Sequence, residues 1–207
     1  MNIHSQEAML QTPTTTPARK PRSDKRRDIM EAALDLFVER GFHGTAVPAL
    51  AQRAGVGAGT IYRYFQNKEA LVNELYRHWK GAIAAHVVAG MSTDLPAREL
   101  FGRLWTQTIE FAAEHPKAFA FLELHHHSSY LDSESQAVEE RAVLLANTLI
   151  TVMQARGAVK EMPSELLMSL IYGAIVGFVR GASEGRYELD EMHSKHAETC
   201  TWEAIRL

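Results

Sequence analysis

The sequence has little of what several classes of protein require. It contains a single cysteine, Cys200, so no disulfide can form within the chain, and a zinc site built from several thiolates is excluded. No segment approaches the run of roughly 20 apolar residues that crosses a membrane, and residues 1–16 lack the apolar run of a secretory signal. Sustained alternation of apolar and polar residues, which is typical of strands, is also missing. We therefore expect a cytoplasmic, all-α protein.

Charge is distributed unevenly along the chain, although the formal net charge is only −3. Residues 19–80 hold 12 basic and 7 acidic residues, a net of +5, whereas residues 81–207 hold 10 basic and 17 acidic residues, a net of −7. This division suggests that the N-terminal third meets a polyanion. A charged, solvated face without a partner is the alternative that composition alone leaves open.

The first 22 residues are polar and contain three prolines, a composition that cannot bury enough apolar surface to become ordered. We expect a flexible arm over residues 1–22. The basic residues at its end and just beyond it are Arg19, Lys20, Arg22, Lys25, Arg26 and Arg27. Such an arm can follow phosphates or enter a minor groove, and a merely solubilising tail is the alternative.

Helical periodicity follows the arm. Apolar residues recur at helical spacing over residues 23–40, and Gly41 is placed to end that helix. A two-turn helix is predicted within residues 47–54, and Gly55 then breaks the chain. Residues 58–65 can form a second short helix. Two short helices separated by a tight, glycine-containing turn have the layout of a helix-turn-helix.

The rest of the chain is predicted to be helical, with breaks at clusters of Gly, Pro, Ser and Asp. Six further helices are expected near residues 68–90, 97–114, 117–130, 135–156, 163–184 and 188–205.

The stretch from Ile29 to Leu75 carries a dense motif. Its residues include Ala32-Ala33, Leu36-Phe37, Gly41-Phe42, Thr45, Leu50-Ala51, Ala54-Gly55-Val56, Gly59-Thr60-Ile61-Tyr62, Tyr64-Phe65 and Asn67-Lys68-Glu69 with Leu71. This stretch resembles the N-terminal signature of the TetR/AcrR family of transcriptional regulators, and a match of this length is highly specific.

The resemblance implies a fold and a function. It implies a helix-turn-helix DNA-binding domain over residues 23–67 and a helical ligand-binding and dimerisation domain over residues 68–207. It further implies a homodimeric repressor that binds a palindromic operator in double-stranded DNA and is released by a small-molecule effector. No enzymatic activity, cofactor, metal or membrane partner is expected.

Candidate DNA-binding residues are carried over from the resemblance where they match. Thr60, Tyr62, Tyr64 and Lys68 stand at positions that usually touch the phosphate backbone in this family, and Thr45 is expected to join them. Core packing is the alternative for the two tyrosines. Arg63 is the best candidate for reading a base, although it could equally bind phosphate. Gly57, Ala58 and Gly59 offer little side chain, but Gly59 lets the backbone approach the bases.

A stripe of glycines suggests where two subunits meet. Gly173, Gly177 and Gly181 fall every fourth residue in a predicted helix, where each costs about 1 kcal/mol relative to alanine. Close approach of another helix would offset that cost, and the last two helices usually form the dimer interface in this family. Packing within one subunit is the alternative. The predicted dimer residues are Leu166, Leu170, Gly173, Gly177, Phe178, Gly181, Trp202 and Ile205.

Large apolar residues are frequent in the middle helices. They predict either a cavity for an apolar or amphipathic ligand or an ordinary solid core. The predicted ligand-binding residues are Trp79, Phe101, Trp105, Phe119, Leu122, His125, Tyr130, Met168 and Tyr172. A regulator without any small-molecule effector is an alternative that the sequence leaves open.

Three consecutive histidines suggest a competing hypothesis. His125, His126 and His127 could belong to a metal-binding helical sensor or enzyme that also uses Glu123. Consecutive helical positions point about 100° apart, however, so the three rings cannot converge on one ion. We therefore expect no metal site, and one of the histidines, His125, is instead a candidate for hydrogen bonding to a ligand.

Overall fold

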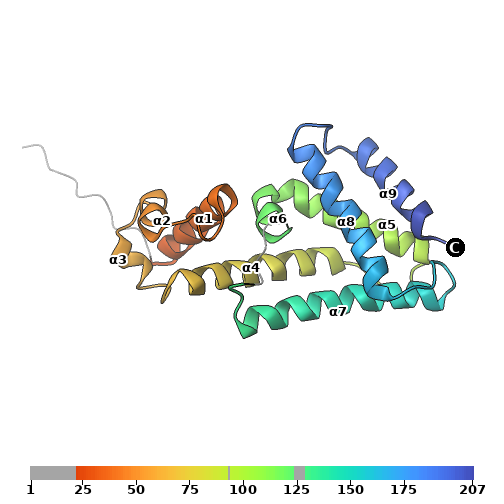
Figure 1. Cartoon of the computed structure of the whole chain (residues 1–207), viewed down its shortest axis with the longest axis horizontal. Coiled ribbons are helices and arrows are strands. Elements are labelled where there is room, and N and C mark those ends of the chain that lie inside the picture. The colour runs from red at the N-terminus through yellow and green to blue at the C-terminus, as the bar shows by residue number, and fades with distance from the viewer. Residues whose placement is uncertain (1–21, 93, 124–128) are drawn as a thin grey trace, which may run out of the picture.

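A computed structural model describes residues 22–92, 94–123 and 129–207, and over these ranges the chain is helical apart from its connections (Figure 1). The helices are α1 (Arg22–Arg40), α2 (Val47–Arg53), α3 (Ala58–Ile61), α4 (Lys68–Val88), α5 (Ala97–Glu114), α6 (Pro116–Glu123), α7 (Ser133–Ala155), α8 (Ser164–Ser183) and α9 (Glu191–Ile205). The only strand-like pairing within these ranges is an isolated bridge between Val159 and Arg206. The predicted all-α fold is confirmed. The arm predicted over residues 1–22 lies almost entirely outside the described residues.

Side-chain caps and glycines set the helix boundaries. The side chains of Asn67, Asp132 and Asp190 accept hydrogen bonds from main-chain N–H groups in the first turns of α4, α7 and α9. Gly41 and Gly55 have φ angles of 69° and 63°, in the left-handed region that favours glycine. They end α1 and open the turn between α2 and α3.

Some predicted boundaries differ from the observed ones. The helix predicted over residues 58–65 is regular only to Ile61, after which the amides of Tyr64 and Phe65 both donate to the Ile61 carbonyl at 2.9 Å. The helix predicted over residues 117–130 is α6, which begins at Pro116 and is described as far as Glu123. Residues 129–130 lie in a turn.

The helices form a small unit at one end of the molecule and a larger bundle at the other (Figure 1). The small unit contains α1 to α3, and the long helix α4 leaves it to run through the bundle beside α5 and α7. Within the bundle, α5 packs against α8 and α9. Because α4 belongs to both parts, it forms a continuous helical connection between the bundle and the small unit.

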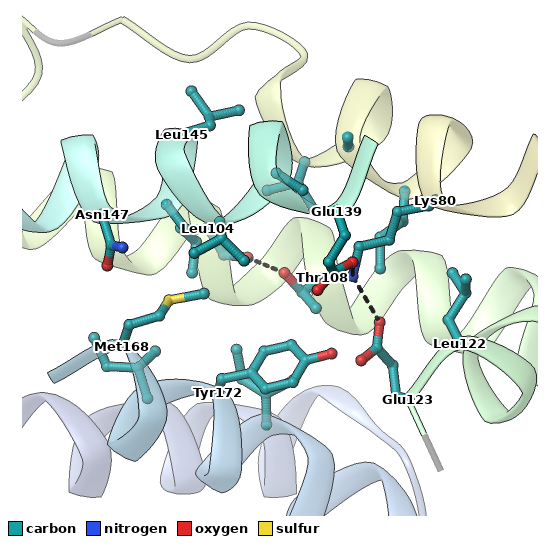
Figure 2. A pocket seen from close by; sticks show the side chains of 18 of the residues that line it. Lys80, Leu104, Thr108, Leu122, Glu123, Glu139, Leu145, Asn147, Met168 and Tyr172 are labelled. Atoms are coloured by element: carbon teal, nitrogen blue, oxygen red, sulfur yellow. Dashed lines mark hydrogen bonds and ion pairs between the residues drawn. The ribbon is translucent and has the colours of Figure 1, made fainter. Parts of the chain in front are cut away.

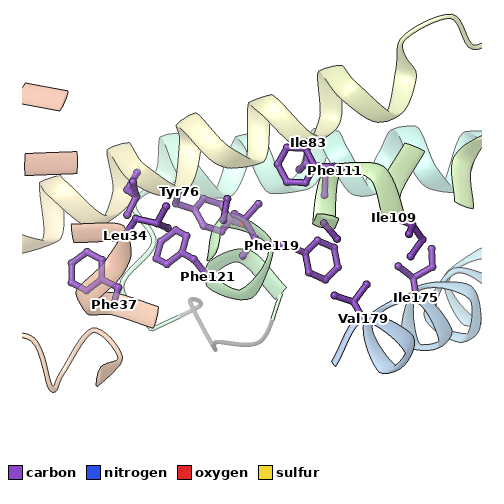
Figure 3. Close-up of a cluster of buried hydrophobic side chains, with 14 of the residues drawn as sticks. Leu34, Phe37, Tyr76, Ile83, Ile109, Phe111, Phe119, Phe121, Ile175 and Val179 are labelled. Atoms are coloured by element: carbon purple, nitrogen blue, oxygen red, sulfur yellow. The ribbon is translucent and has the colours of Figure 1, made fainter. Parts of the chain in front are cut away.

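Buried apolar side chains connect the two parts (Figure 3). Phe37 on α1 stacks with Phe121 on α6, with ring centroids 6.2 Å apart. The cluster continues along α4 and α6 and reaches Ile175 and Val179 on α8. The small unit is therefore packed onto the bundle through α6 as well as through α4.

One helix departs from the sequence expectation about membrane spans. By length and composition alone, α8 is long and apolar enough to cross a membrane. Part of this helix is buried inside the protein, and its inner residues Ile171 and Ile175 belong to the core. A core helix of a soluble protein passes the same test, so the finding is weak evidence for a membrane role.

Candidate functional site

The small unit holds α3 against α1 and α2 and presents its other face to solvent. Ile61 and Phe65 are 2% and 3% exposed and fill the inner side of α3 and the turn after it. The exposed residues are those of the opposite side: Gly57, Ala58, Gly59, Tyr62 and Arg63. We call these five residues the reading surface. They stand clear of the core because the buried pair fixes the orientation of the short helix.

The two tyrosines differ in their surroundings. Tyr62 is 55% exposed, whereas Tyr64 is partly buried and packs against the core. Thr60 is half-buried. Among the predicted DNA-binding residues, Tyr62 and Arg63 therefore have the most accessible large side chains.

Thr45 and Lys68 form contacts inside the small unit. Thr45 is 1% exposed, and its hydroxyl donates to the carbonyls of Leu36 and Gly41 at 3.1 and 2.8 Å. The Lys68 Nζ donates to the carbonyls of Phe42 and Thr45 at 2.8 and 3.0 Å and lies 4.2 Å from the centroid of the Phe42 ring. Lys68 thus ties the start of α4 to the loop that precedes α2.

A chain of ion pairs joins α2, α1 and α6. Arg53 on α2 contacts Glu39 and Asp35 on α1 at 3.0 and 3.5 Å, and Lys117 on α6 contacts Asp35 at 2.6 Å. The hydrogen bond from Arg53 holds the pKa of Glu39 below its ordinary value. These exposed pairs contribute little stability each, and the pair between Lys117 and Asp35 adds to the contact between the small unit and α6.

A pocket of about 540 Å³ lies within the bundle, in the size range of small-molecule sites. Helices α4, α5, α6, α7 and α8 all contribute to its lining. Most of the lining is apolar and includes Ile83, Val87, Leu104, Leu122, Met168 and Ile175. A ligand in this pocket would contact α4 and α6, the two helices through which the bundle meets the small unit.

The predicted ligand residues divide into two groups. Leu122, Met168 and Tyr172 line the pocket. Trp79, Phe101, Trp105, Phe119 and Tyr130 pack elsewhere in or against the core. Trp105 is 1% exposed and donates to Ser194 Oγ at 3.1 Å, and Tyr130 stacks on Phe42 with centroids 4.3 Å apart. His125 lies outside the described residues.

Three charged side chains lie together at one end of the pocket (Figure 2). Lys80 on α4 lies 2.9 Å from Glu139 on α7 and 3.9 Å from Glu123 on α6. Burial raises the pKa of Glu123 to about 6, with Lys80 opposing and Glu139 reinforcing that shift. The Tyr76 hydroxyl also donates to Glu139, and burial together with this hydrogen bond raises the pKa of Tyr76.

Sequence reasoning missed the polar part of the pocket lining, namely Lys80, Glu139 and Asn147. One available signal concerned Lys80: it falls at helical spacing between Tyr76 and Ile83, on the apolar stripe of α4. A lysine within such a stripe is a candidate buried charge rather than part of a solvated face.

The predicted dimer residues fall into an exposed group and a buried group. Leu166 and Leu170 are 51% and 53% exposed, and Gly173 and Gly177 continue the same exposed stripe of α8. We call these four residues the α8 stripe. The others are buried within the subunit: Phe178, Gly181, Trp202 and Ile205. Gly181 has its own reason to be glycine, because a Cβ there would lie 2.6 Å from Cζ of Tyr187.

The metal hypothesis gains no support from the structure. Across the described parts of the chain, no three His, Cys, Asp or Glu residues are grouped so that they could hold a metal ion. His126 and His127, like His125, lie outside the described residues.

Comparison with known proteins identifies relatives of both parts of the chain. The family model described as bacterial regulatory proteins, tetR family, matches residues 29–75. The model described as tetracyclin repressor-like, C-terminal domain, matches residues 81–207.

Individual relatives match over most of their length. The fatty acid metabolism regulator protein of Bacillus subtilis (strain 168) is 26% identical over 75% of this chain and 82% of its own. A "Probable acrEF/envCD operon repressor" of Escherichia coli (strain K12) is 28% identical over 75% of this chain and 74% of its own. The crystal structure of a TetR family transcription regulator from Marinobacter aquaeolei VT8 superposes with a TM-score of 0.75 at 27% identity, covering 89% of this chain and 96% of that one.

Proposed function

The chain belongs to the tetR family of bacterial regulatory proteins, and from this premise we propose that it is a homodimeric repressor of a palindromic operator, released by a small molecule. DNA binding and regulation of transcription are the activity of the family. The repressor role, the operator, the dimer and the effector are the proposal.

The observation that carries the proposal is the reading surface. A short helix anchored by buried Ile61 and Phe65 turns two glycines, an alanine, Tyr62 and Arg63 toward solvent. A backbone free of bulky side chains can approach base edges closely, while a phenol and a guanidinium provide donors for phosphate and guanine. We assign phosphate contact to Tyr62 and base contact to Arg63.

Thr45 and Lys68 stabilise the small unit that carries this surface. The Lys68 bonds hold α4 against the loop before α2, and the Thr45 bonds hold that loop against the end of α1. We therefore propose that they shape the DNA-binding unit, in addition to any contact that they make with phosphate. Thr60 and Tyr64, which are half-buried, remain candidates for phosphate contact at the edge of the reading surface.

A palindromic operator requires two reading surfaces related by twofold symmetry. The α8 stripe fits this requirement, because two leucines and two glycines in one row allow the same helix of a second subunit to approach closely. We propose that the two subunits pair through this stripe.

The pocket supports release by a ligand. Its lining includes Tyr76, Lys80 and Ile83 of α4 and Leu122 and Glu123 of α6. The same two helices contact the small unit, α4 through Lys68 and α6 through Phe121 and Lys117. A ligand that favours a different spacing of α4 and α6 would shift the two reading surfaces out of register with the operator.

Fluorescence anisotropy with the DNA upstream of the chain's own coding region tests the proposal. We expect a complex that depends on a palindrome, weakens with added salt and outlasts competition by unrelated DNA. Tyr62→Ala should lower affinity for all sequences about equally, whereas Arg63→Ala should cost about 1–3 kcal/mol and relax discrimination at one base position.

Arg186→Ala supplies the matched control, because Arg186 is an exposed arginine in the connection between α8 and α9. It should leave both affinity and discrimination unchanged. Binding without preference over competitor DNA would contradict the proposed operator function, and a uniform loss in Arg63→Ala would contradict its assignment to a base.

A further inference from the structure

The charges that line the pocket are unbalanced. Lys80 supplies the single ammonium of the described lining, while Glu123, Glu139 and Glu165 supply three carboxylates. Histidine and arginine are absent from this described lining, which also includes the phenols of Tyr76 and Tyr172. The described part of this mostly apolar lining thus carries an excess of negative charge.

The ammonium of Lys80 is committed mainly to Glu139. It lies 2.9 Å from a Glu139 oxygen, within hydrogen-bonding distance, but 3.9 Å from the nearest Glu123 oxygen. Glu139 also accepts a hydrogen bond from Tyr76. Glu123 is the more deeply buried of the two acids, with a side chain 6% exposed against 38% for Glu139. The deeper carboxylate therefore has the weaker contact with Lys80, which is costly in an apolar environment.

A second acceptor lies unsatisfied at the other end of the pocket. Asn147 Oδ1 is buried and has no hydrogen-bond partner among the described residues. Figure 2 shows Asn147 and Glu123 at opposite ends of the view, with Leu104, Met168 and Tyr172 between them. The pocket thus combines an apolar middle with polar ends that favour hydrogen-bond donors.

From this arrangement we infer that the pocket binds a lipophilic cation, in which a protonated amine or amidine pairs with Glu123 and an apolar body lies along Leu104 and Met168. The inference rests on the proposed ligand-binding function and specifies its chemistry. A fatty acid is disfavoured, because its carboxylate would meet those of Glu123 and Glu139 at Lys80 and would compete with Glu139 for the ammonium.

Three probes with one alkyl chain and different head groups test the inference. Isothermal titration of the full-length protein with decylamine, decanol and decanoate at neutral pH compares a cation, a neutral molecule and an anion. We expect decylamine to bind about tenfold more tightly than decanol, and decanoate to bind most weakly. Tighter binding of decanoate than of decylamine would overturn the inference.

Two variants assign the preference to named charges. Glu123→Gln should reduce affinity for decylamine about tenfold and leave decanol unchanged, because only the charge pair is lost. Glu140→Gln, an exposed acid on α7 outside the lining, is the matched control and should bind like the wild type. Lys80→Met should strengthen decylamine binding by removing a competing cation. Unchanged decylamine binding in Glu123→Gln, or its loss in Lys80→Met with decanol still bound, would overturn the assignment.

DNA binding measured without any probe separates this inference from the proposed function. A protein that binds its operator but prefers decanoate refutes the head-group inference and leaves the regulator intact. A protein that prefers decylamine but shows no sequence-specific DNA binding refutes the operator proposal and supports the pocket chemistry.

Discussion

Gly181 and Tyr187 form a packing contact that involves only one subunit. A Cβ at Gly181 would overlap the Tyr187 hydroxyl, and two contacts with Phe178 hold the Tyr187 side chain in place. It stacks on Phe178 with centroids 5.4 Å apart, and its hydroxyl donates to the Phe178 carbonyl at 2.9 Å. The ring cannot move aside without weakening both contacts. Gly181 thus differs from Gly173 and Gly177, at which a Cβ would meet nothing within 4 Å.

We expect Gly181→Ala to lower the free energy of unfolding by about 1–3 kcal/mol, the usual cost of overpacking. Urea denaturation at a fixed protein concentration measures the change. Combination with Tyr187→Ala provides the control, because removal of the ring should abolish the penalty. An equal penalty with and without the Tyr187 ring would show that the contact is not its cause.

Glu123 should make stability depend on pH. Burial raises its pKa from an ordinary 4.5 to about 6, so between these values the folded state binds more protons than the unfolded state. The contribution of Glu123 to the free energy of unfolding therefore falls as the pH rises from 4.5 to 6. Above pH 6 the ionised carboxylate lowers the free energy of unfolding by about 2 kcal/mol. Glu123→Gln should remove this dependence.

Urea denaturation at acidic and neutral pH, compared between wild type and Glu123→Gln, checks that expectation. Other carboxyls, such as Asp132, have a lowered pKa and titrate in both proteins, so only the difference between the two proteins reports on Glu123. The variant should gain stability relative to the wild type at neutral pH and lose that advantage below about pH 4.5. Glu140→Gln should show no such change, and a parallel pH response in all three proteins would refute a raised pKa at Glu123.

Individual residues also show where sequence reasoning reaches its limit. The DNA-binding unit was predictable because its glycines and buried apolar positions depend on local spacing, as Gly41, Gly55 and Ile61 show. The lining of the pocket was less predictable, because large aromatic residues such as Trp105 fill a solid core as readily as they line a cavity. Lys80 and Glu139 are 59 positions apart, and their pairing arises only when α4 and α7 pack together.

At the scale of helices, the predicted boundaries agree with the observed ones to different degrees. The range predicted for α5 matches the observed Ala97–Glu114. The start of α9 was placed at residue 188, whereas Asp190 caps the helix and Glu191 begins it. The helix containing α3 was predicted too long, because apolar spacing at Ile61 and Phe65 is compatible with both a helix and the tighter turn that is observed.

The α8 stripe leads to a prediction about assembly. Leu170 is 53% exposed on this stripe, so a charge there would be buried without a partner if two α8 helices meet. Leu170→Glu should therefore convert the dimer to a monomer and sharply weaken operator binding, while the helical content of the subunit is retained. Sedimentation velocity and circular dichroism measure the two properties.

Leu144→Glu is the matched control for this prediction, because Leu144 is a leucine that is 67% exposed on a different helix, α7. It should remain dimeric. A monomeric Leu144→Glu alongside a dimeric Leu170→Glu would place the interface on α7 and refute the assignment to α8.

At the scale of the whole molecule, the basic N-terminal third and the acidic remainder coincide with the two structural parts. The net charge of +5 over residues 19–80 covers α1 to α3 and much of α4, whereas the pocket with its three carboxylates lies in the acidic bundle. The basic part therefore favours the DNA polyanion, whereas the acidic bundle favours a cation. Helices α4 and α6 contact both parts, and Tyr130 adds a further contact by stacking on Phe42, so communication between the parts has these routes.

Phe121 on α6 is the clearest point at which to interrupt that communication. Its ring stacks on Phe37 of α1, while Leu122 and Glu123, the next two residues, line the pocket. Phe121→Leu should leave the separate affinities for operator and decylamine near wild-type values, because a leucine preserves most of the apolar contact. It should nevertheless weaken the effect of bound decylamine on operator affinity, and of bound operator on decylamine affinity. Such a coupling free energy typically amounts to about 1–3 kcal/mol.

Operator affinity measured with and without saturating decylamine, together with decylamine affinity measured with and without operator, gives that coupling twice, and the two values must agree. Phe119→Leu is the control, since Phe119 is equally buried on the same helix but lies toward Val179 of α8 (Figure 3). We expect Phe119→Leu to retain the coupling that Phe121→Leu loses. Full coupling in Phe121→Leu would show that the signal travels along α4, where Lys68 and Lys80 lie on one continuous helix, without needing the contact between α6 and α1.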